Sequence, residues 1–163
     1  MKQKIISVMF VVYLAFLVWA ILWKCHFPYV GEIRVINLNP FAANEKLELL
    51  FNWVIFIPFG FFLCETGKNP LLALAIVVLA SLSLETLQFL LGVGCSDTTD
   101  LILNSVGGAI GIICYWLLRL LFRQHTTKIA LVISIIITLM IIYAGFSFVF
   151  LGHIRIGNMM FSI

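Results

Sequence analysis

Five apolar runs of about twenty residues each follow one another along the chain, which is the span of helix needed to cross a hydrocarbon core. The runs cover residues 5–23, 47–64, 70–91, 100–122 and 129–151. A chain of 163 residues that is 63% hydrophobic and only 10% charged has too little polar surface to cover a water-soluble globule. We therefore predict an all-α, polytopic membrane protein, a bundle of about five transmembrane helices forming a single domain over residues 1–163.

Local signals add detail to this map of predicted helices. The second run contains Pro58, which predicts a kink there but is tolerated in a spanning helix when neighbouring helices satisfy the freed backbone groups. Asn69 followed by Pro70 fits an N-cap and a first helical position, so the third helix should begin there. The stretch from Lys24 to Lys46 is expected to be an external loop or an interfacial segment.

Basic residues set the expected orientation, because short cytoplasmic loops collect Lys and Arg. With the N-terminus inside, the cytoplasmic set is Lys2, Lys4, Lys68, Arg119, Arg123 and Lys128, and the external set is Lys24, Arg34, Lys46 and Arg155. We predict a multi-pass membrane protein with its N-terminus in the cytoplasm. Six of the seven acids then lie on or near the outer face, namely Glu32, Glu45, Glu48, Glu85, Asp97 and Asp100. This asymmetry points to an outward-facing site.

The segment from Ser83 to Gly111 carries the most informative pattern. At about 100° per helical residue, one stripe collects three polar residues above three glycines: Asp97, Asp100, Asn104, Gly107, Gly108 and Gly111. The glycine half is typical of helix packing, where absent side chains allow close approach. The polar half leaves two interpretations open. Asp97 or Ser96 caps the fourth helix and Asn104 bonds a neighbour, or the carboxylates and amide line a polar pocket.

Glu85 and Gln88 lie one turn apart on the third helix, close enough along the chain to join this polar set. A buried Glu85 must be protonated, hydrogen-bonded or paired with a cation, for which Arg34 and Arg155 are candidates. General acid–base chemistry by Glu85 with an aspartate is conceivable, but no nucleophile motif supports it, so the sequence leaves open whether the protein is an enzyme.

Other classes of site find no support. The carboxylate spacing matches no metal-binding loop, and the chain has no phosphate-binding glycine loop, so we predict no metal, no cofactor and no nucleic-acid partner. Cys25 and Cys95 can both face the exterior, and whether they pair stays open.

Four spaced motifs resemble those of VanZ-like membrane proteins. They are Asn37-x-Asn-Pro-Phe41, Asn52-x-x-x-Phe-x-Pro-x-Gly60, Glu85-x-x-Gln88 and Asp97-x-x-Asp-x-x-x-Asn-x-x-Gly107. The resemblance covers most of the chain, and the tail His153-x-Arg-Ile156 likens it further to the teicoplanin-resistance member of that family or a near relative. Many members have an arginine shortly before the first aspartate, where this chain has Val93-Gly94-Cys95-Ser96. Any anion-binding role that depends on that arginine is therefore in doubt, unless Arg34 or Arg155 replaces it.

The resemblance implies low-level resistance to the glycopeptide antibiotic teicoplanin, without rebuilding of the peptidoglycan precursor terminus. The hypothesis for its mechanism is an outer polar pocket that engages an envelope component, such as a membrane lipid or a lipid-linked cell-wall precursor, or the antibiotic itself. The expected pocket residues are Arg34, Asn37, Asn52, Glu85, Gln88, Asp97, Asp100, Asn104 and Arg155. The alternatives are an intramembrane enzyme that modifies an envelope lipid or polymer, and a structural partner of another envelope protein that packs through Gly107, Gly108 and Gly111.

Overall fold

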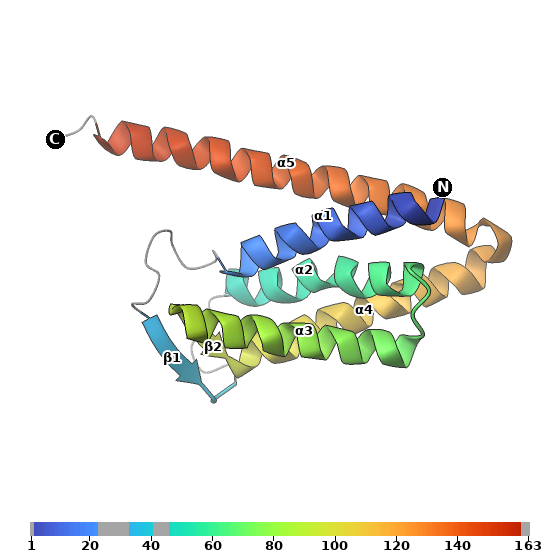
Figure 1. The fold of residues 1–163 in the computed structure, drawn as a ribbon, viewed down its shortest axis with the longest axis horizontal. Coiled ribbons are helices and arrows are strands. Elements are labelled where there is room, and N and C mark those ends of the chain that lie inside the picture. Colours follow the sequence, from blue (N-terminus) through green and yellow to red (C-terminus); the bar gives the residue numbers. More distant parts are fainter. Residues whose placement is uncertain (1, 23–32, 41–45, 161–163) are drawn as a thin grey trace.

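The computed structural model describes residues 2–22, 33–40 and 46–160, without the side chains of residues 2–3, 33–34, 46–48, 94–95 and 144–160. Nearly all of the described chain is helical (Figure 1). In chain order the elements are α1 (Lys2–Leu22), β1 (Ile33–Asn37), α2 (Lys46–Glu65), α3 (Pro70–Leu91), β2 (Val93–Asp97), α4 (Thr98–Phe122), the 3-10 helix η1 (Arg123–His125) and α5 (Thr126–Met160). Each expected apolar run therefore coincides with an α-helix.

Three described segments are long and apolar enough to cross a membrane. They are Lys4–Leu22, Pro70–Leu91 and Thr98–Tyr143. The last of these contains α4, η1 and the part of α5 whose side chains are described. The apolar stretch Leu49–Glu65 of α2 is shorter. The all-α prediction is confirmed at this coarse level, whereas the count of five spanning helices and the single domain over 1–163 stay predictions.

Both ends of α3 show why the helix has these bounds. The side-chain oxygen of Asn69 accepts a hydrogen bond from the Leu72 N–H at 2.8 Å, with Pro70 in the first turn, so the predicted cap is confirmed. At the other end Gly92 adopts the left-handed conformation, with φ of 63°, and its N–H donates to the Phe89 carbonyl at 3.2 Å. This cap turns the chain sharply into β2.

A two-stranded parallel sheet is the main departure from the expected architecture. β1 pairs with β2 in a register that runs from Ile33 opposite Val93 to Asn37 opposite Asp97. The segment expected to be an external loop or an interfacial segment therefore contains a strand. Parallel strands need a long crossover connection, which the antiparallel helices α2 and α3 supply here. Figure 1 shows the strand pair at the end of the bundle where α3 ends and α4 begins.

The closest helix contact joins α2 to α4. A Cβ atom added at Gly107 would collide with the Trp53 carbonyl, and one added at Gly111 would collide with the Ile57 carbonyl. These glycines are buried, and their lack of side chains brings the two backbones together. The glycine stripe is thus used inside the chain, and the hypothesis that it packs against another envelope protein does not fit this structure.

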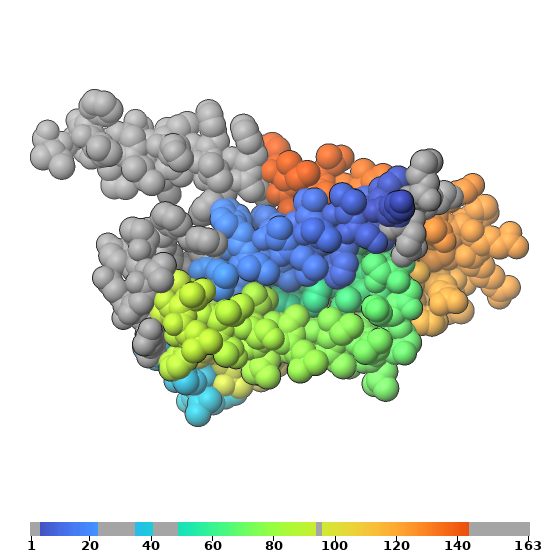
Figure 2. Space-filling view, in the orientation of Figure 1, coloured from blue at the N-terminus to red at the C-terminus, as the bar shows by residue number. Residues whose placement is uncertain are grey.

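The remaining surface is strongly apolar. Figure 2 shows side chains of α1 and α3 covering one face of the bundle, with the described part of α5 along one edge. Large aliphatic residues lie exposed on several helices, among them Leu79 on α3, Leu120 on α4 and Met140 on α5. Such an exterior suits a hydrocarbon environment, in which apolar side chains carry no exposure penalty.

Candidate functional site

Asp97 is the centre of the polar site at the strand end of the bundle. It is the N-cap of α4, and its Oδ1 accepts the Thr99 N–H at 2.7 Å. Its Oδ2 accepts a hydrogen bond from the Asn37 side-chain amide at 3.0 Å. The Thr98 hydroxyl adds a hydrogen bond to the Asn37 carbonyl at 3.0 Å. One carboxylate thus starts a helix and fixes the end of β1 against it.

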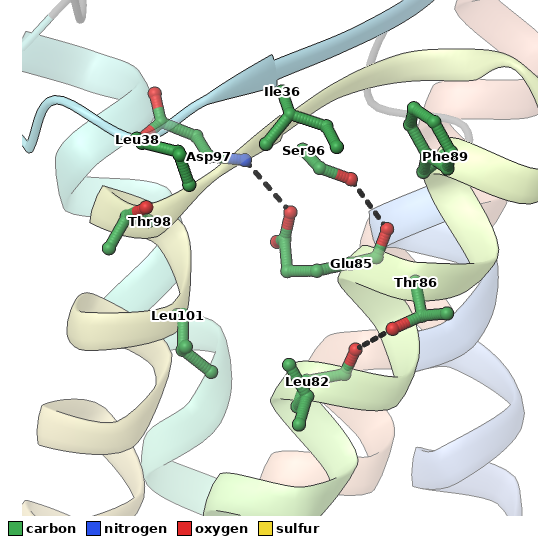
Figure 3. A pocket seen from close by; sticks show the side chains of 10 residues that line it. All are labelled: Ile36, Leu38, Leu82, Glu85, Thr86, Phe89, Ser96, Asp97, Thr98 and Leu101. Carbon is green, nitrogen blue, oxygen red and sulfur yellow. Dashed lines mark hydrogen bonds between the residues drawn. The ribbon is translucent and has the colours of Figure 1, made fainter.

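Glu85 meets Asp97 from the facing helix. The Asp97 backbone N–H donates to Glu85 Oε2 at 3.0 Å, and the Ser96 hydroxyl donates to the Glu85 carbonyl at 2.6 Å (Figure 3). Glu85 lies on α3, where Gly92 reverses the chain and brings β2 back beside it. The Glu85 side chain is only 7% exposed. Its carboxylate is therefore anchored by a backbone donor rather than left in free solvent.

An amphipathic cavity of about 310 Å³ lies at this junction. Its lining combines Glu85, Asp97 and three hydroxyl residues with apolar side chains from three elements (Figure 3). The lining residues are Ile36, Leu38, Leu82, Glu85, Thr86, Phe89, Ser96, Asp97, Thr98 and Leu101. Such a mixture of apolar walls and a few convergent polar groups is typical of small-molecule sites.

Below the cavity a second layer of polar contacts ties the helices together. The Asn52 amide on α2 donates to the Asp100 carboxylate on α4, and both side chains are buried. One turn further along α4, the Asn104 amide donates to the Ser81 hydroxyl at 3.0 Å. The Gln88 amide instead reaches the Ile21 carbonyl of α1 at 2.9 Å. Each bond crosses between two helices, as expected for polar groups buried in an apolar bundle.

Two acceptors in this layer make no hydrogen bond within the described part of the chain. They are Gln88 Oε1 and Asn104 Oδ1, and both residues are buried. Buried acceptors of this kind are commonly satisfied by water or a ligand donor.

The structure separates the predicted residues into two groups. Glu85 and Asp97 line the cavity, and Asn37 adjoins it through its bond to Asp97. The other four described members lie in the helix-to-helix layer and are not among the lining residues: Asn52, Gln88, Asp100 and Asn104. The structure therefore places these four beside the cavity rather than in its lining, and a shared ligand site for all the predicted residues stays a prediction. The capping interpretation of Asp97 is confirmed, and a cavity exists beside it.

The side chains of the two predicted cations, Arg34 and Arg155, are not among those that the structure describes. Only the backbone of Arg34 is described, and it pairs with Gly94 across the strands. Arg155 lies in α5, and its side chain is outside the described part, as are those of Cys25 and Cys95.

Several contributors to the site were not predicted. Ile36 and Leu38 form an apolar wall because β1 lies beside α3 and β2, a pairing that no local sequence pattern encodes. Ser81 has a clearer signal, since it lies four residues before Glu85 and seven before Gln88, on one helical face. That spacing extends the polar stripe of α3 by one more turn.

The chemistry that the site offers is mainly hydrogen-bond acceptance. The described lining contains two carboxylates and no Lys or Arg. Among the described residues no group of three or more His, Cys, Asp and Glu side chains is placed to hold a metal ion. A ligand that presents N–H, O–H or ammonium groups fits this lining, whereas an anionic group next to the carboxylates would be repelled.

Sequence comparison decides the family. Residues 10–123 match the VanZ/LLP1 family. The chain belongs to the VanZ/LLP1 family. It is also 32% identical to Protein VanZ of Enterococcus faecium over 155 residues. The aligned region covers 89% of this chain and 91% of that protein. No solved structure matches the chain.

Membership confirms the resemblance drawn from the four motifs, all of which lie within the matched residues. The VanZ/LLP1 match includes β1, the α2–α3 hairpin, β2 and α4, which together build the cavity. It ends before α5, so Arg155 lies outside it. Family membership and the apolar helices together indicate a membrane protein.

Proposed function

We propose that this protein confers low-level resistance to teicoplanin from the bacterial plasma membrane, by binding an amphipathic envelope component or the antibiotic in the cavity beside Glu85 and Asp97. The observation that carries the proposal is the amphipathic lining at a family-matching motif, with the Glu85 carboxylate held by the Asp97 N–H. An ionisable side chain kept buried in an apolar bundle is costly and is often retained for function.

The acceptor-rich lining defines what the ligand offers. Sugar hydroxyls, amide N–H groups or an ammonium would donate to the carboxylates, while Phe89, Leu82 and Leu101 would contact apolar parts. If the ligand is a lipid-linked cell-wall precursor, its sugar or peptide portion would occupy the cavity, because its phosphates would be repelled by Glu85 and Asp97. Teicoplanin also presents hydroxyl and amide donors.

The proposed topology places this cavity on the outer face. All five α-helices would span the membrane, with α2 crossing through its apolar stretch and α4 and α5 forming a hairpin around η1. The N-terminus would be cytoplasmic, in keeping with Arg119, Arg123 and Lys128 near that hairpin. The strand pair and the cavity would then face the cell wall.

The test is antibiotic susceptibility in cells that express the wild type or Glu85→Gln at matched membrane levels, with teicoplanin as the probe and vancomycin as the comparison drug. The substitution removes the charge but keeps an oxygen to accept the Asp97 N–H. We expect the protection against teicoplanin to fall at least fourfold. Asp100→Asn, one layer deeper, should have a smaller effect because Asp100 does not line the cavity.

Glu65→Gln is the matched control, because Glu65 is 8% exposed against 7% for Glu85 and lies at the opposite end of the bundle. It should protect as well as the wild type. Full protection by Glu85→Gln would refute the proposed role of the cavity. Loss of protection in all three variants would assign the effect to stability.

A further inference from the structure

A second cavity lies on the other side of α2 and has no polar character. Its volume is about 280 Å³, and its walls come from α1, α2 and α5, with Tyr13, Val54, Pro58, Ile137, Met140 and Ile141 among them. Asn52, which belongs to the polar layer, lies between the groove residues Phe51 and Val54 in sequence but points to α4. The helix α2 therefore separates the Asn52–Asp100 layer of polar contacts from an apolar groove.

Tyr13 is the one polar side chain among the described residues that line the groove, and it is already engaged. Its hydroxyl donates a hydrogen bond to the Ile55 carbonyl on α2. The described side chains of the groove therefore offer a ligand no free hydroxyl, amide or charged group. Sugars, peptides and lipid headgroups would lose hydrogen bonds on entering such a groove.

The same seam between α2 and α5 is closed at one end. The Ser134 hydroxyl donates to Glu65 Oε2 at 2.6 Å, and both side chains are buried. Ser134, Ile137 and Ile141 have the i, i+3, i+7 spacing of one helical face, and Pro58 and Glu65 are likewise seven residues apart on α2. The groove residues therefore lie on the strand-end side of the Glu65–Ser134 bond.

The depth of the groove fits the hydrocarbon layer. At about 1.5 Å per helical residue, Pro58 lies about 10 Å and Phe51 about 21 Å along α2 from Glu65, within a core of about 30 Å. Met140 is 66% exposed, so this wall borders the surrounding bilayer, and the flexible thioether side chain adapts to an irregular neighbour. An apolar groove of about 280 Å³ at this depth can hold part of one hydrocarbon chain.

We infer that this groove binds one acyl chain of a membrane phospholipid, which lies along α2 on the strand-end side of the Glu65–Ser134 bond. The inference is separate from the proposed role of the polar cavity. Glu85→Gln should leave acyl-chain binding unchanged.

The test uses the full chain in nanodiscs of phosphatidylglycerol, of which a small fraction carries a photoreactive diazirine in mid-chain. After irradiation, labelled residues are mapped by peptide mass spectrometry. We expect label on α2 near Val54 and on α5 near Met140 to exceed, at least threefold, the label around Leu79 on α3, which is 62% exposed and so samples bulk lipid equally well. Equal labelling of both faces would overturn the inference.

Groove-filling variants keep the test decisive. Val54→Trp and Met140→Trp fill the groove from α2 and from α5, and Leu79→Trp is the control; each must elute as the wild type does in size exclusion. Either filling variant that folds should reduce the groove label to the level at Leu79, and the control should not. Unchanged groove label in both would overturn the inference.

Two other results would also overturn it by assigning the groove to another occupant. Cross-linked dimers would assign the groove to a second copy of the chain. Displacement of the label by teicoplanin but not by vancomycin would assign it to the antibiotic's acyl chain.

Discussion

The side-chain amide of Asn52 on α2 donates a hydrogen bond to the carboxylate of Asp100 on α4, immediately beneath the cavity that Glu85 and Asp97 line. This bond lies on the same helix pair as the glycine contacts at Gly107 and Gly111. The α2–α4 seam therefore has a polar tie at its strand end and backbone contact further along. Both features hold the floor of the cavity in place.

The Asn52–Asp100 bond should show as a measurable coupling. In a double-mutant cycle with Asn52→Ala and Asp100→Ala, we expect a coupling energy of about 0.5–2 kcal/mol, the range for interhelical hydrogen bonds in membranes. The measurement is denaturant unfolding in mixed micelles. Additive effects of the two substitutions would show that the bond contributes nothing to stability.

Leucine at Gly111 should separate α2 from α4. The new side chain would meet the Ile57 carbonyl and the Phe61 nitrogen, both of which are backbone atoms that cannot move aside without shifting the helix. We expect a loss of about 3 kcal/mol or more, seen as aggregation in size exclusion and a lower thermal midpoint. Val106→Leu, on the exposed face of the same helix, is the control and should melt like the wild type.

Asp97 should be needed mainly as an oxygen acceptor for capping. Asp97→Ala loses both the Thr99 and the Asn37 bonds and should reduce stability by about 1–2 kcal/mol. Asp97→Asn keeps an acceptor for the Thr99 N–H and should recover more than half of that loss. Thermal melting in detergent measures both. Equal destabilisation by the two variants would indicate that the charge, rather than the cap, stabilises the strand end.

The Tyr13 hydroxyl should stabilise the contact between α1 and α2. Tyr13→Phe leaves the Ile55 carbonyl without its side-chain donor and should cost about 1 kcal/mol or more. Tyr143→Phe, at a tyrosine that is 74% exposed, is the control and should unfold like the wild type. Denaturant unfolding in mixed micelles gives the comparison, and equal stability of Tyr13→Phe and the wild type would contradict this role.

Cysteine labelling of intact cells tests the orientation. In a chain whose four native cysteines are replaced by serine, Leu38→Cys beside the cavity should react with a membrane-impermeant maleimide. Lys68→Cys, in the turn between α2 and α3, should react only after the cells are opened. Both residues are exposed, so access depends on the side of the membrane. The reverse pattern would invert the proposed topology and place the cavity in the cytoplasm.

The helices were predictable because their signals are local. Apolar runs of membrane length, the Asn69–Pro70 start and the capping role of Asp97 each depend on neighbouring residues, and the structure places helices at those positions. The glycine stripe of α4 was visible from its spacing. Its partner was not, because nothing in α4 specifies that Trp53 and Ile57 of α2 supply the opposing carbonyls.

The strand pair could not be predicted from the sequence for the same reason, and neither could the division of the polar residues between the cavity and the helix contacts. β1 and β2 are far apart in the chain, and five-residue strands carry too short a pattern to distinguish from a loop. Helical spacing placed Asp100 and Asn104 on one face with Asp97, but not their partners. Asp100 forms a hydrogen bond with Asn52, and Asn104 forms one with Ser81. These bonds hold both side chains in helix contacts, so only some of the predicted residues reach the cavity.

The pairing of Asn37 with Asp97, residues 60 positions apart, has a consequence for how the protein is made. β1 emerges from the ribosome well before β2, and both α2 and α3 lie between them. In the proposed topology, the strands meet only when that hairpin has inserted into the bilayer with both of its open ends on one side. Closure of this small sheet would then depend on correct insertion during biogenesis, and a chain with an inverted or uninserted hairpin would leave the edges of both strands unpaired.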